Sequence, residues 1–388
     1  MTTLIRKAIY TREDEESLII NGDGWNFHDE ETKEPLHTLH PYPAKFIPQI
    51  PRKAIKLWTK RGDLVYDPFS GCGTTVLEAS LAGRYCIGTD NNAVANLIAR
   101  AKTAIYSQED IIALHRFTNN ISNGLGSAPL RPELIPANKN FHYWFDPITV
   151  TRLAALKGLI LAEKEPLKTL LLAIFSSIIV RVSYQDSDTR YARKRRNVTP
   201  DEVDSTFYSR LSSIITQLKT VLVLNRTPVE IIQADARHVD FIKNLSVSLI
   251  VTSPPYLNAY DYHKYHRQRL HWICDDDNIK FARDNEIGSH DKFTRKNATP
   301  DDYFYDMDVC FNEWKRVLKI GGRCLIVIGD AIVSKNPVNV ADSFIDMLIN
   351  KGFSIKNRWI RTIKSTQRSF NVKNSRISHE HVILAVKN

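Results

Sequence analysis

The stretch LVYDPFSGCGTTVLEASLAGRYCIGTD, residues 64–90, decides the fold. A short apolar run ends on Asp67, a glycine-rich turn follows, apolar residues recur at helical spacing over 74–82, and a second apolar run ends on Asp90. A periodicity that changes in this way predicts a strand, a tight turn, a helix and a second strand. A further helix is predicted over 92–104.

The same alternation returns in the second half of the chain. Strands are predicted at 229–235, 247–252, 323–329, 353–362 and 381–386, and helices at 300–318 and 339–351, with a turn at 321–322. Strands that alternate with helices imply an α/β fold with a doubly wound, mostly parallel sheet. Such a sheet binds ligands beyond the carboxyl ends of its strands, so the polar residues there are expected to share one crevice. These residues are Asp67, Asp90, Asp235 and Ser253.

Residues 107–225 interrupt this alternation. Helices are predicted there over 110–120, 149–163, 167–184 and 201–223. We therefore divide the chain into an N-terminal arm over 1–35, an α/β domain over 36–106 and 226–388, and a helical insertion over 107–225.

Composition narrows the class of protein. The formal net charge of +10 favours a polyanionic partner, because neutralised phosphates release counterions. No apolar run approaches the roughly 18 residues of a membrane span. The acidic run 13–16 stands where a signal peptide would need an apolar core, so we expect a cytoplasmic protein. The five cysteines are scattered and predict neither a disulfide framework nor a zinc site, and no metal is expected.

The loop after the first predicted strand has the features of a ligand-binding turn. Gly71 and Gly73 allow the backbone to turn tightly and to approach a ligand closely. A phosphate-binding P-loop would need a lysine after Gly73, and a dinucleotide fingerprint would need a glycine where Val76 stands. The loop is therefore expected to pack against a ligand without gripping a pyrophosphate. Asp90, at the end of the next strand, could accept hydrogen bonds from both hydroxyls of a ribose.

A second motif, Thr252-Ser253-Pro254-Pro255-Tyr256, follows the strand predicted at 247–252. Its two prolines fix the backbone and supply no N–H donors, so the Ser253 and Pro254 carbonyls, the Ser253 hydroxyl and the Tyr256 ring are expected to face the crevice. Acceptors around a base amino group localise the nitrogen lone pair for in-line attack on a sulfonium methyl group. An aromatic ring can stack on a base that has been flipped out of the duplex. The motif therefore predicts methylation of a base amino group.

These motifs resemble those of the DNA amino-methyltransferases, which make N4-methylcytosine or N6-methyladenine. DPFSGCGTT at 67–75 is similar to the family's cofactor loop, GTD at 88–90 to its ribose-binding strand end, and TSPPY at 252–256 to its catalytic motif. HPYPAKF at 40–46 resembles the segment that lines the methionine side of the pocket, and ADA at 234–236 resembles the strand end near the adenine. The resemblance covers about residues 36–105 and 229–388.

The resemblance implies a Rossmann-like methyltransferase fold with S-adenosylmethionine as cofactor. The catalytic residues that it implies are Ser253, Pro254, Pro255 and Tyr256. The cofactor-binding residues that it implies are His40, Pro41, Lys45, Phe46, Asp67, Phe69, Gly71, Gly73, Thr74, Thr75, Asp90, Asn91, Asp235, Ala236 and Thr252. The α/β domain would then be the catalytic domain, and the insertion 107–225 a candidate DNA-recognition region.

Two departures from the family pattern bear on the substrate. The cofactor loop precedes TSPPY, whereas in many N4-cytosine enzymes the catalytic half comes first, and the insertion stands where that family usually has a short link. Ser253 before the two prolines resembles the N4-cytosine group, since Asp or Asn is commoner there in the N6-adenine group. The chain is therefore most like a site-specific N4-cytosine methyltransferase of a restriction-modification or host-modification system. N6-adenine methylation, an RNA base methyltransferase and a non-catalytic DNA-binding module are the alternatives.

If the enzyme belongs to a restriction-modification system, a cognate restriction endonuclease would act as a separate protein.

Two segments of the chain could contact double-stranded DNA. The segment 258–272 interleaves aromatic and basic residues, and we expect phosphate contacts and stacking there, although an amphipathic helix with Leu270 and Trp272 buried fits it equally well. Its candidate DNA-contacting residues are Tyr260, His263, Lys264 and Arg267. The basic run 190–196 could enter a groove, although charge runs are usually solvated faces. Its candidates are Arg190, Arg193, Arg195 and Arg196.

Overall fold

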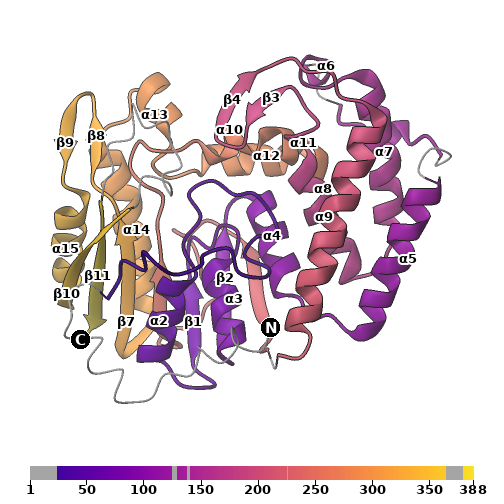
Figure 1. The fold of residues 1–388 in the computed structure, drawn as a ribbon. Helices are drawn as coiled ribbons and strands as arrows, with labels where there is room; N and C mark the ends of the chain where they lie inside the picture. Colours follow the sequence, from indigo (N-terminus) through magenta and orange to yellow (C-terminus); the bar gives the residue numbers. More distant parts are fainter. Residues whose placement is uncertain (1–23, 125–128, 138–139, 225, 364–378) are drawn as a thin grey trace.

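The computed structural model describes residues 24–124, 129–137, 140–224, 226–363 and 379–388, so residues 1–23 of the N-terminal arm lie outside it. A seven-stranded sheet runs through the centre of the molecule in the order β10-β11-β7-β6-β1-β2-β5 (Figure 1). Its strands are β1 (Leu64–Asp67), β2 (Tyr85–Asp90), β5 (Val229–Gln233), β6 (Val247–Thr252), β7 (Leu318–Ile328), β10 (Phe353–Thr362) and β11 (His379–Lys387).

Strand direction confirms the predicted doubly wound sheet. Within the seven-stranded sheet, β11 is antiparallel to its neighbours β10 and β7, and all other neighbouring strands are parallel. From β1 the chain adds β2 and β5 on one side and then returns to add β6 and β7 on the other. The strand order therefore reverses between β1 and β6, which is where a sheet of this kind binds its ligand.

Helices cover both faces of the sheet. The helices α2 (Gln49–Trp58), α3 (Thr74–Leu81) and α4 (Ala93–Thr103) share a core with Val65, Leu249 and Val251. On the opposite face, α14 (Pro300–Val317) and α15 (Val340–Asn350) pack against Tyr66 and Ile250. Successive strand residues thus enter opposite cores, which explains why these strands read as continuous apolar runs.

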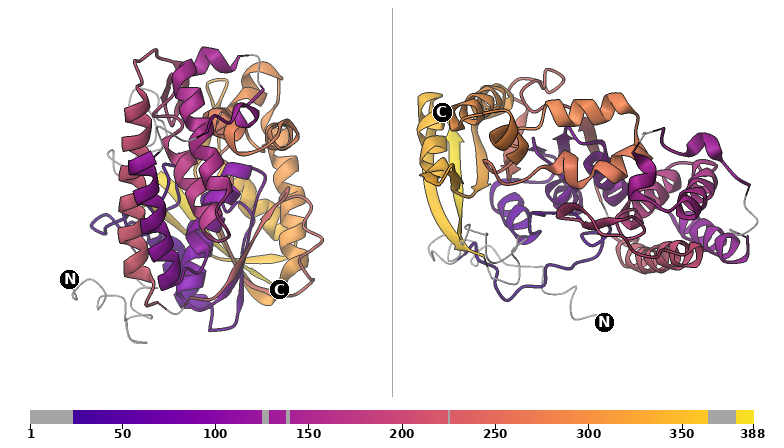
Figure 2. Two further views of the ribbon diagram at one scale, coloured as in Figure 1. Left: turned by 90° about the vertical axis from the view of Figure 1, so that its right-hand side faces the viewer. Right: turned by 90° about the horizontal axis from the view of Figure 1, so that it is seen from above.

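The insertion forms the helical layer seen beside the sheet in Figures 1 and 2. Its longer helices are α5 (Gln108–Gly124), α7 (Pro147–Leu161), α8 (Leu167–Ile178) and α9 (Pro200–Val221), with the short helices η3 (Pro132–Leu134) and α6 (Phe141–Trp144). Their apolar faces share one buried cluster with Leu97 and Ile98 of α4, so the insertion is packed onto the sheet domain.

Two parts of the chain differ from the prediction by more than a few residues. Helix α8 ends at Ile178 instead of 184, and the run that contains Arg190 forms a hairpin of β3 (Gln185–Ser187) and β4 (Arg190–Arg193). β7 begins at Leu318 and passes through the predicted turn at 321–322, with a register shift against β6. Tertiary pairing in both places overrides the local helix or turn preference.

The remaining segments follow the catalytic motif or flank the sheet. The helices α10 (Tyr262–Tyr265), α11 (Arg267–Ile273), α12 (Asp276–Asp284) and α13 (His290–Arg295) lie between β6 and α14, and β8 (Ala331–Val333) pairs with β9 (Asn336–Val338). Trp25 is buried against Trp58 and Trp359, so the described part of the N-terminal arm packs on the sheet domain. All five cysteines are free, and no helix among the described residues is long and apolar enough to cross a membrane.

Candidate active site

A cleft opens at the carboxyl ends of β1, β2, β5 and β6. It holds about 920 Å³ of space, its open mouth included. The strand-end residues expected to meet there, Asp67, Asp90, Asp235 and Ser253, all line it. The loop after β1 and the motif after β6 therefore face the same cleft.

The glycine-rich loop is shaped by its own backbone. Gly71 and Gly73 have φ of +49° and +80°, in the left-handed region that favours glycine. Gly73 precedes α3, and a Cβ there would lie 2.8 Å from the Cβ of Ala99 in α4. Gly71 lies beside the Tyr42 ring, and its N–H donates to Asp90 at 2.9 Å. The loop therefore joins two helices closely and presents its backbone to the cleft.

Asp90 is held by two backbone donors. Its Oδ2 accepts from the Gly71 N–H and its Oδ1 accepts from the Asn92 N–H, each at 2.9 Å. Burial raises the pKa of Asp90 to about 6, although these two donors lower it, and the charges of Asp67 and Glu286 raise it further. Each carboxylate oxygen has two lone pairs, so Asp90 keeps the capacity to accept from a ligand.

Asp67 and Asp235 differ in how their charges are balanced. Burial raises the pKa of Asp67 to about 6, although the nearby Thr75 and Thr252 hydroxyls and the Phe69 N–H, which donates to its Oδ1 at 3.2 Å, lower it. Asp235 instead pairs with Arg237, whose Nη2 donates to its Oδ2 at 2.6 Å. The uncompensated acidic character of the cleft therefore comes from Asp67 and Asp90.

The segment after the catalytic motif supplies another wall. Glu286 is buried, accepts from the backbone N–H of Tyr262 at 2.5 Å, and pairs with His263 Nδ1. Burial raises the pKa of Glu286, while the bond to His263 lowers it. Tyr262, His263, Asn285, Glu286 and Ile287 all line the cleft.

The segment 40–46 closes a further side of the cleft. Its Tyr42 ring stacks on His266 with centroids 4.8 Å apart and on Tyr262 at 6.1 Å. Lys45 lines the cleft and donates from Nζ to the His37 carbonyl at 2.6 Å. His40 is buried behind this wall, with its Nε2 3.2 Å from Ser176 Oγ in α8. His40 thus fixes the segment to the insertion.

The predicted cofactor residues divide into two groups. Those that line the cleft are Lys45, Phe46, Asp67, Phe69, Gly71, Thr74, Asp90, Asn91, Asp235 and Ala236. Those that are not among its lining residues are His40, Pro41, Gly73, Thr75 and Thr252. Thr75 shows the role of this second group, because its hydroxyl donates to the buried Val251 carbonyl at 3.4 Å and supports the strands beneath the cleft.

Sequence reasoning missed several lining residues. Tyr42 and Tyr262 stood in segments that had been singled out, and their aromatic rings were the available signal. Glu286 carried no local signal, because tertiary folding alone brings it beside His263. The others missed are Ala44, Pro68, Ser70, Cys72, Asn92, Ala234, Ala282, Asn285 and Ile287.

The catalytic motif is braced from behind. Ser253 and Pro255 line the cleft, whereas Pro254 is buried and Tyr256 is not among the described residues that line it. The Tyr256 hydroxyl donates to Glu380 Oε1 at 2.7 Å, and the Tyr303 hydroxyl donates to the Pro255 carbonyl at 2.9 Å. Burial raises the pKa of Tyr256 well above its usual value, and the Glu380 charge raises it further, so the phenol remains a donor.

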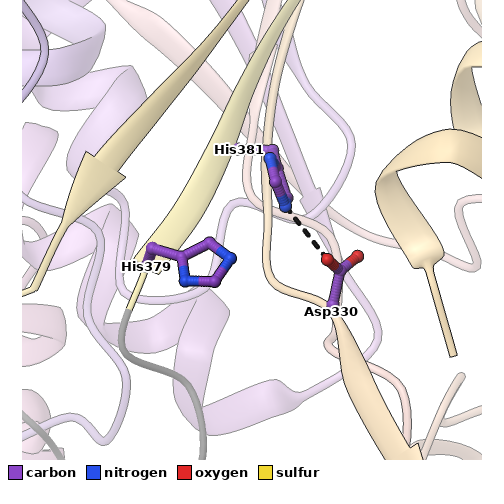
Figure 3. A group of neighbouring side chains, drawn as sticks. All are labelled: Asp330, His379 and His381. Carbon is purple, nitrogen blue, oxygen red and sulfur yellow. Dashed lines mark hydrogen bonds and ion pairs between the residues drawn. The ribbon is translucent and has the colours of Figure 1, made fainter. Parts of the chain in front are cut away.

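Among the described residues, Asp330, His379 and His381 form a group that could supply three atoms to a metal ion, all within 4.8 Å of one another (Figure 3). Arg358 Nε donates to His381 Nδ1 at 3.3 Å, so His381 Nε2 carries the proton shared with Asp330 at 3.1 Å. Both ring nitrogens of His381 are thus engaged, and the neighbouring guanidinium opposes a further cation. We therefore assign this group to anchoring the start of β11.

The basic run 190–196 lies on the β3–β4 hairpin, beside α10 and α11 (Figure 1). Arg190, Arg193 and Arg195 are exposed, and the Arg193 guanidinium lies 4.4 Å from the centre of the Tyr143 ring. Arg196 differs, because its Nη2 donates to the Gln185 carbonyl at 2.6 Å and its Nη1 to the Arg181 carbonyl at 3.1 Å. Arg196 therefore holds the hairpin together.

The end of the segment 258–272 belongs to the helix α11, in which Leu270 and Trp272 are fully buried. This part of the segment is therefore the amphipathic helix that the sequence also allowed. Of its predicted DNA-contacting residues, Arg267 is exposed, Tyr260 stacks on Tyr262, and Lys264 pairs with Asp291 at 2.7 Å. His263 is committed to Glu286 in the cleft.

α11 is fastened to the hairpin and to the insertion. Arg269 is fully buried, pairs with Asp188 in the hairpin, and donates from Nε to the Ser176 carbonyl of α8 at 3.1 Å. Arg267 lies 6.0 Å from the centre of the Tyr191 ring of β4. The two segments singled out from sequence are thus parts of one surface.

The strand order and the cleft define a class I-type methyltransferase fold with an amino-methylase motif. The sequence model of the DNA methylase family matches residues 6–100 and 247–388, and this chain belongs to that family. S-adenosylmethionine is the cofactor of the family.

The chain is also similar to individual proteins. The chain is 27% identical over 286 residues to the type II methyltransferase M.MvaI of Kocuria varians. The aligned region covers 65% of this chain and 61% of that protein. It is 32% identical over 102 residues to the type II methyltransferase M.MjaII of Methanocaldococcus jannaschii, covering 25% of this chain and 19% of that protein. The chain thus spans less than two thirds of the length of these relatives. A structure of a SAM-dependent methyltransferase from Methanosarcina mazei aligns with 10% identity and a TM-score of 0.35, over 86% of this chain and 96% of that one.

Proposed function

We propose that this chain is a site-specific DNA methyltransferase that transfers a methyl group from S-adenosylmethionine to the exocyclic N4 amino group of cytosine in double-stranded DNA. The observation that carries the proposal is that Ser253 and Pro255 line the same cleft as Gly71 and Asp90. A cofactor held by the loop after β1 would therefore meet a base held by the motif after β6.

The residues of the cleft suit this cofactor. Asp90 retains lone pairs that can accept from ribose hydroxyls, and the side chains of Phe69 and Ile287 offer apolar surface to an adenine ring. When bound, S-adenosylmethionine supplies a methyl group on a positively charged sulfur. Asp67 also lines this cleft.

Catalysis by the chain's own groups consists mainly of orientation. Ser253 and Pro255 line the cleft, and the Ser253 hydroxyl and the backbone of the motif would accept hydrogen bonds from a base amino group, which would localise the nitrogen lone pair. The prolines keep these acceptors rigid, and the Tyr303 bond to the Pro255 carbonyl fixes the loop from behind. Tyr256 would contact the flipped base through its ring.

The choice of cytosine rests on Ser253, because an uncharged hydroxyl before the two prolines is typical of the N4-cytosine enzymes. N6-adenine methylation is the second candidate, because the amino-methyltransferases that this chain resembles make either N4-methylcytosine or N6-methyladenine. We further propose that the exposed arginines of the β3–β4 hairpin, together with Arg267, contact the phosphates of the duplex.

We also propose a place in a restriction-modification system, because M.MvaI and M.MjaII are named type II methyltransferases. A separate endonuclease would then cut DNA that this enzyme has left unmethylated.

The test is to incubate the purified chain with S-adenosylmethionine carrying a deuterated methyl group and with unmethylated bacterial DNA, and to identify the labelled nucleoside by mass spectrometry. Labelled N4-methylcytosine supports the proposal, and labelled N6-methyladenine replaces it with the second candidate. Label only in a parallel reaction with RNA, or no label with cofactor binding intact, would overturn DNA methylation. Asp90→Ala serves as the inactive control.

A further inference from the structure

Glu380 connects the catalytic motif to the far edge of the sheet. It is the second residue of β11, and its Oε1 accepts from the Tyr256 hydroxyl at 2.7 Å. Its Oε2 accepts from Arg361 Nη1 at 2.5 Å, and Arg361 is its direct partner across the β10–β11 ladder. The carboxylate therefore bridges a fixed strand residue and the only aromatic ring of the TSPPY motif.

This bridge is largely shielded from water. The side chains of Glu380 and Arg361 are 14% and 6% exposed. A hydrogen bond to an ionised group in such surroundings is short and strong, and water competes with it poorly. A phenol held at its hydroxyl end cannot swing away about the Cα–Cβ bond, so the long axis of the ring keeps one direction.

The start of β11 is itself anchored. Successive side chains of a strand point to opposite faces, so His379 and His381 project away from Glu380. On their side, His381 is bonded to Asp330, just after β7 (Figure 3), and its ring also accepts from Arg358 of β10. Glu380 is thus presented to Tyr256 from a strand end that is fixed on its other face.

We propose that Glu380 is a positioning residue that fixes the position of the Tyr256 ring against the target base. This inference rests on the proposed function, in which Tyr256 contacts the flipped base. Glu380 lies outside the motifs recognised from sequence, and it acts through Tyr256 alone. It therefore affects the handling of DNA and leaves the cofactor end of the cleft unchanged.

The test is a double-mutant cycle with Glu380→Ala and Tyr256→Phe, which keeps the ring and removes the hydroxyl. Each single change is expected to lower kcat/KM for DNA by about 10- to 100-fold, the range of a lost hydrogen bond to a charged group. In the Tyr256→Phe background, Glu380→Ala should lower kcat/KM by less than about twofold, because the bond it removes is already gone. Glu380→Gln, which retains an acceptor oxygen, should restore most of the activity.

Cofactor binding and an exposed control separate this role from a structural one. The Kd for S-adenosylmethionine, measured by calorimetry, should stay within about twofold of wild type in every variant. Lys356→Ala, which removes an exposed charge from β10, should leave kcat/KM unchanged. Additive losses in the cycle, or an equal loss of cofactor affinity in Glu380→Ala, would overturn the inference. If Glu380→Ala does not fold, the same cycle is run with Glu380→Met, which fills a similar space but offers no carboxylate acceptor, and additivity there overturns it equally. If wild type methylates no DNA, the proposed function fails; additive losses in an active enzyme defeat this inference alone.

Discussion

We expect Asp90 to set the pH dependence of cofactor binding. Burial raises its pKa to about 6, so near that pH half of the free protein carries a neutral carboxyl group. Ribose hydroxyls bind best to the ionised form, since it offers acceptors on both oxygens. Binding therefore favours loss of the proton, and affinity should rise with pH up to about 6 and then level off.

The size of the effect follows from the titration. One unit below the pKa about one tenth of the carboxyl groups are ionised, so the Kd for S-adenosylmethionine at pH 5 should be about tenfold weaker than at pH 8. Asp90→Asn removes the charge and places an amide N–H₂ against one of the two backbone donors. We expect its Kd at pH 8 to be about 10- to 150-fold weaker, equivalent to ~1.5–3 kcal/mol, and independent of pH through this range.

Isothermal titration calorimetry between pH 5 and 8 measures both quantities. The matched control is Asp67→Asn, because the pKa of Asp67 is also raised to about 6 by burial in the same cleft. The pH slope should survive in Asp67→Asn and vanish in Asp90→Asn. A wild-type Kd that is equal at pH 5 and 8, or a slope that persists in Asp90→Asn, would refute the reasoning. Thermal unfolding of each variant verifies that it is folded at the assay temperature.

Three other outcomes are expected. Tyr256→Ala should lower methyl transfer to DNA by about 100-fold or more while the calorimetric Kd for the cofactor stays within about twofold, and a matching loss of cofactor affinity would contradict its assignment to the base. Replacing Arg190 and Arg195 with alanine should weaken DNA binding and reduce the slope of log K against log salt by about 0.9 for each phosphate that is no longer neutralised; an unchanged slope in a fluorescence titration would remove the hairpin from the interface. Gly73→Ala should lower the free energy of unfolding by about 1–3 kcal/mol, because φ is +80° and the new Cβ would lie 2.8 Å from Ala99. Chemical denaturation checks this, with a stability equal to wild type as the contrary result.

The sequence predicted the features that depend on local pattern. The strand ends at Asp67 and Asp90, the glycine loop and the motif at 252–256 all fall where the structure has them, because apolar runs buried on both faces are visible without a fold. What it could not predict depends on tertiary contacts. Glu286 reaches the cleft through its pairing with His263, and Glu380 reaches Tyr256 from a strand 124 residues away.

Charge alone was also a poor guide to the role of each arginine. Arg195 is exposed, whereas Arg196 beside it is bonded to backbone carbonyls of its own hairpin. Arg269, in the other basic segment, is fully buried. A run of like residues therefore holds structural and surface positions together, and contacts with neighbouring elements decide which is which.

The ion pair between the fully buried Arg269 and the partly exposed Asp188 has a consequence for any exchange of the insertion between relatives. It joins α11, which belongs to the sheet domain by sequence, to a hairpin that belongs to the insertion. A graft of residues 107–225 alone would leave Arg269 buried without its carboxylate, which is costly for a charge. The unit that can be exchanged is therefore discontinuous, and a working chimaera must carry α11 together with the insertion.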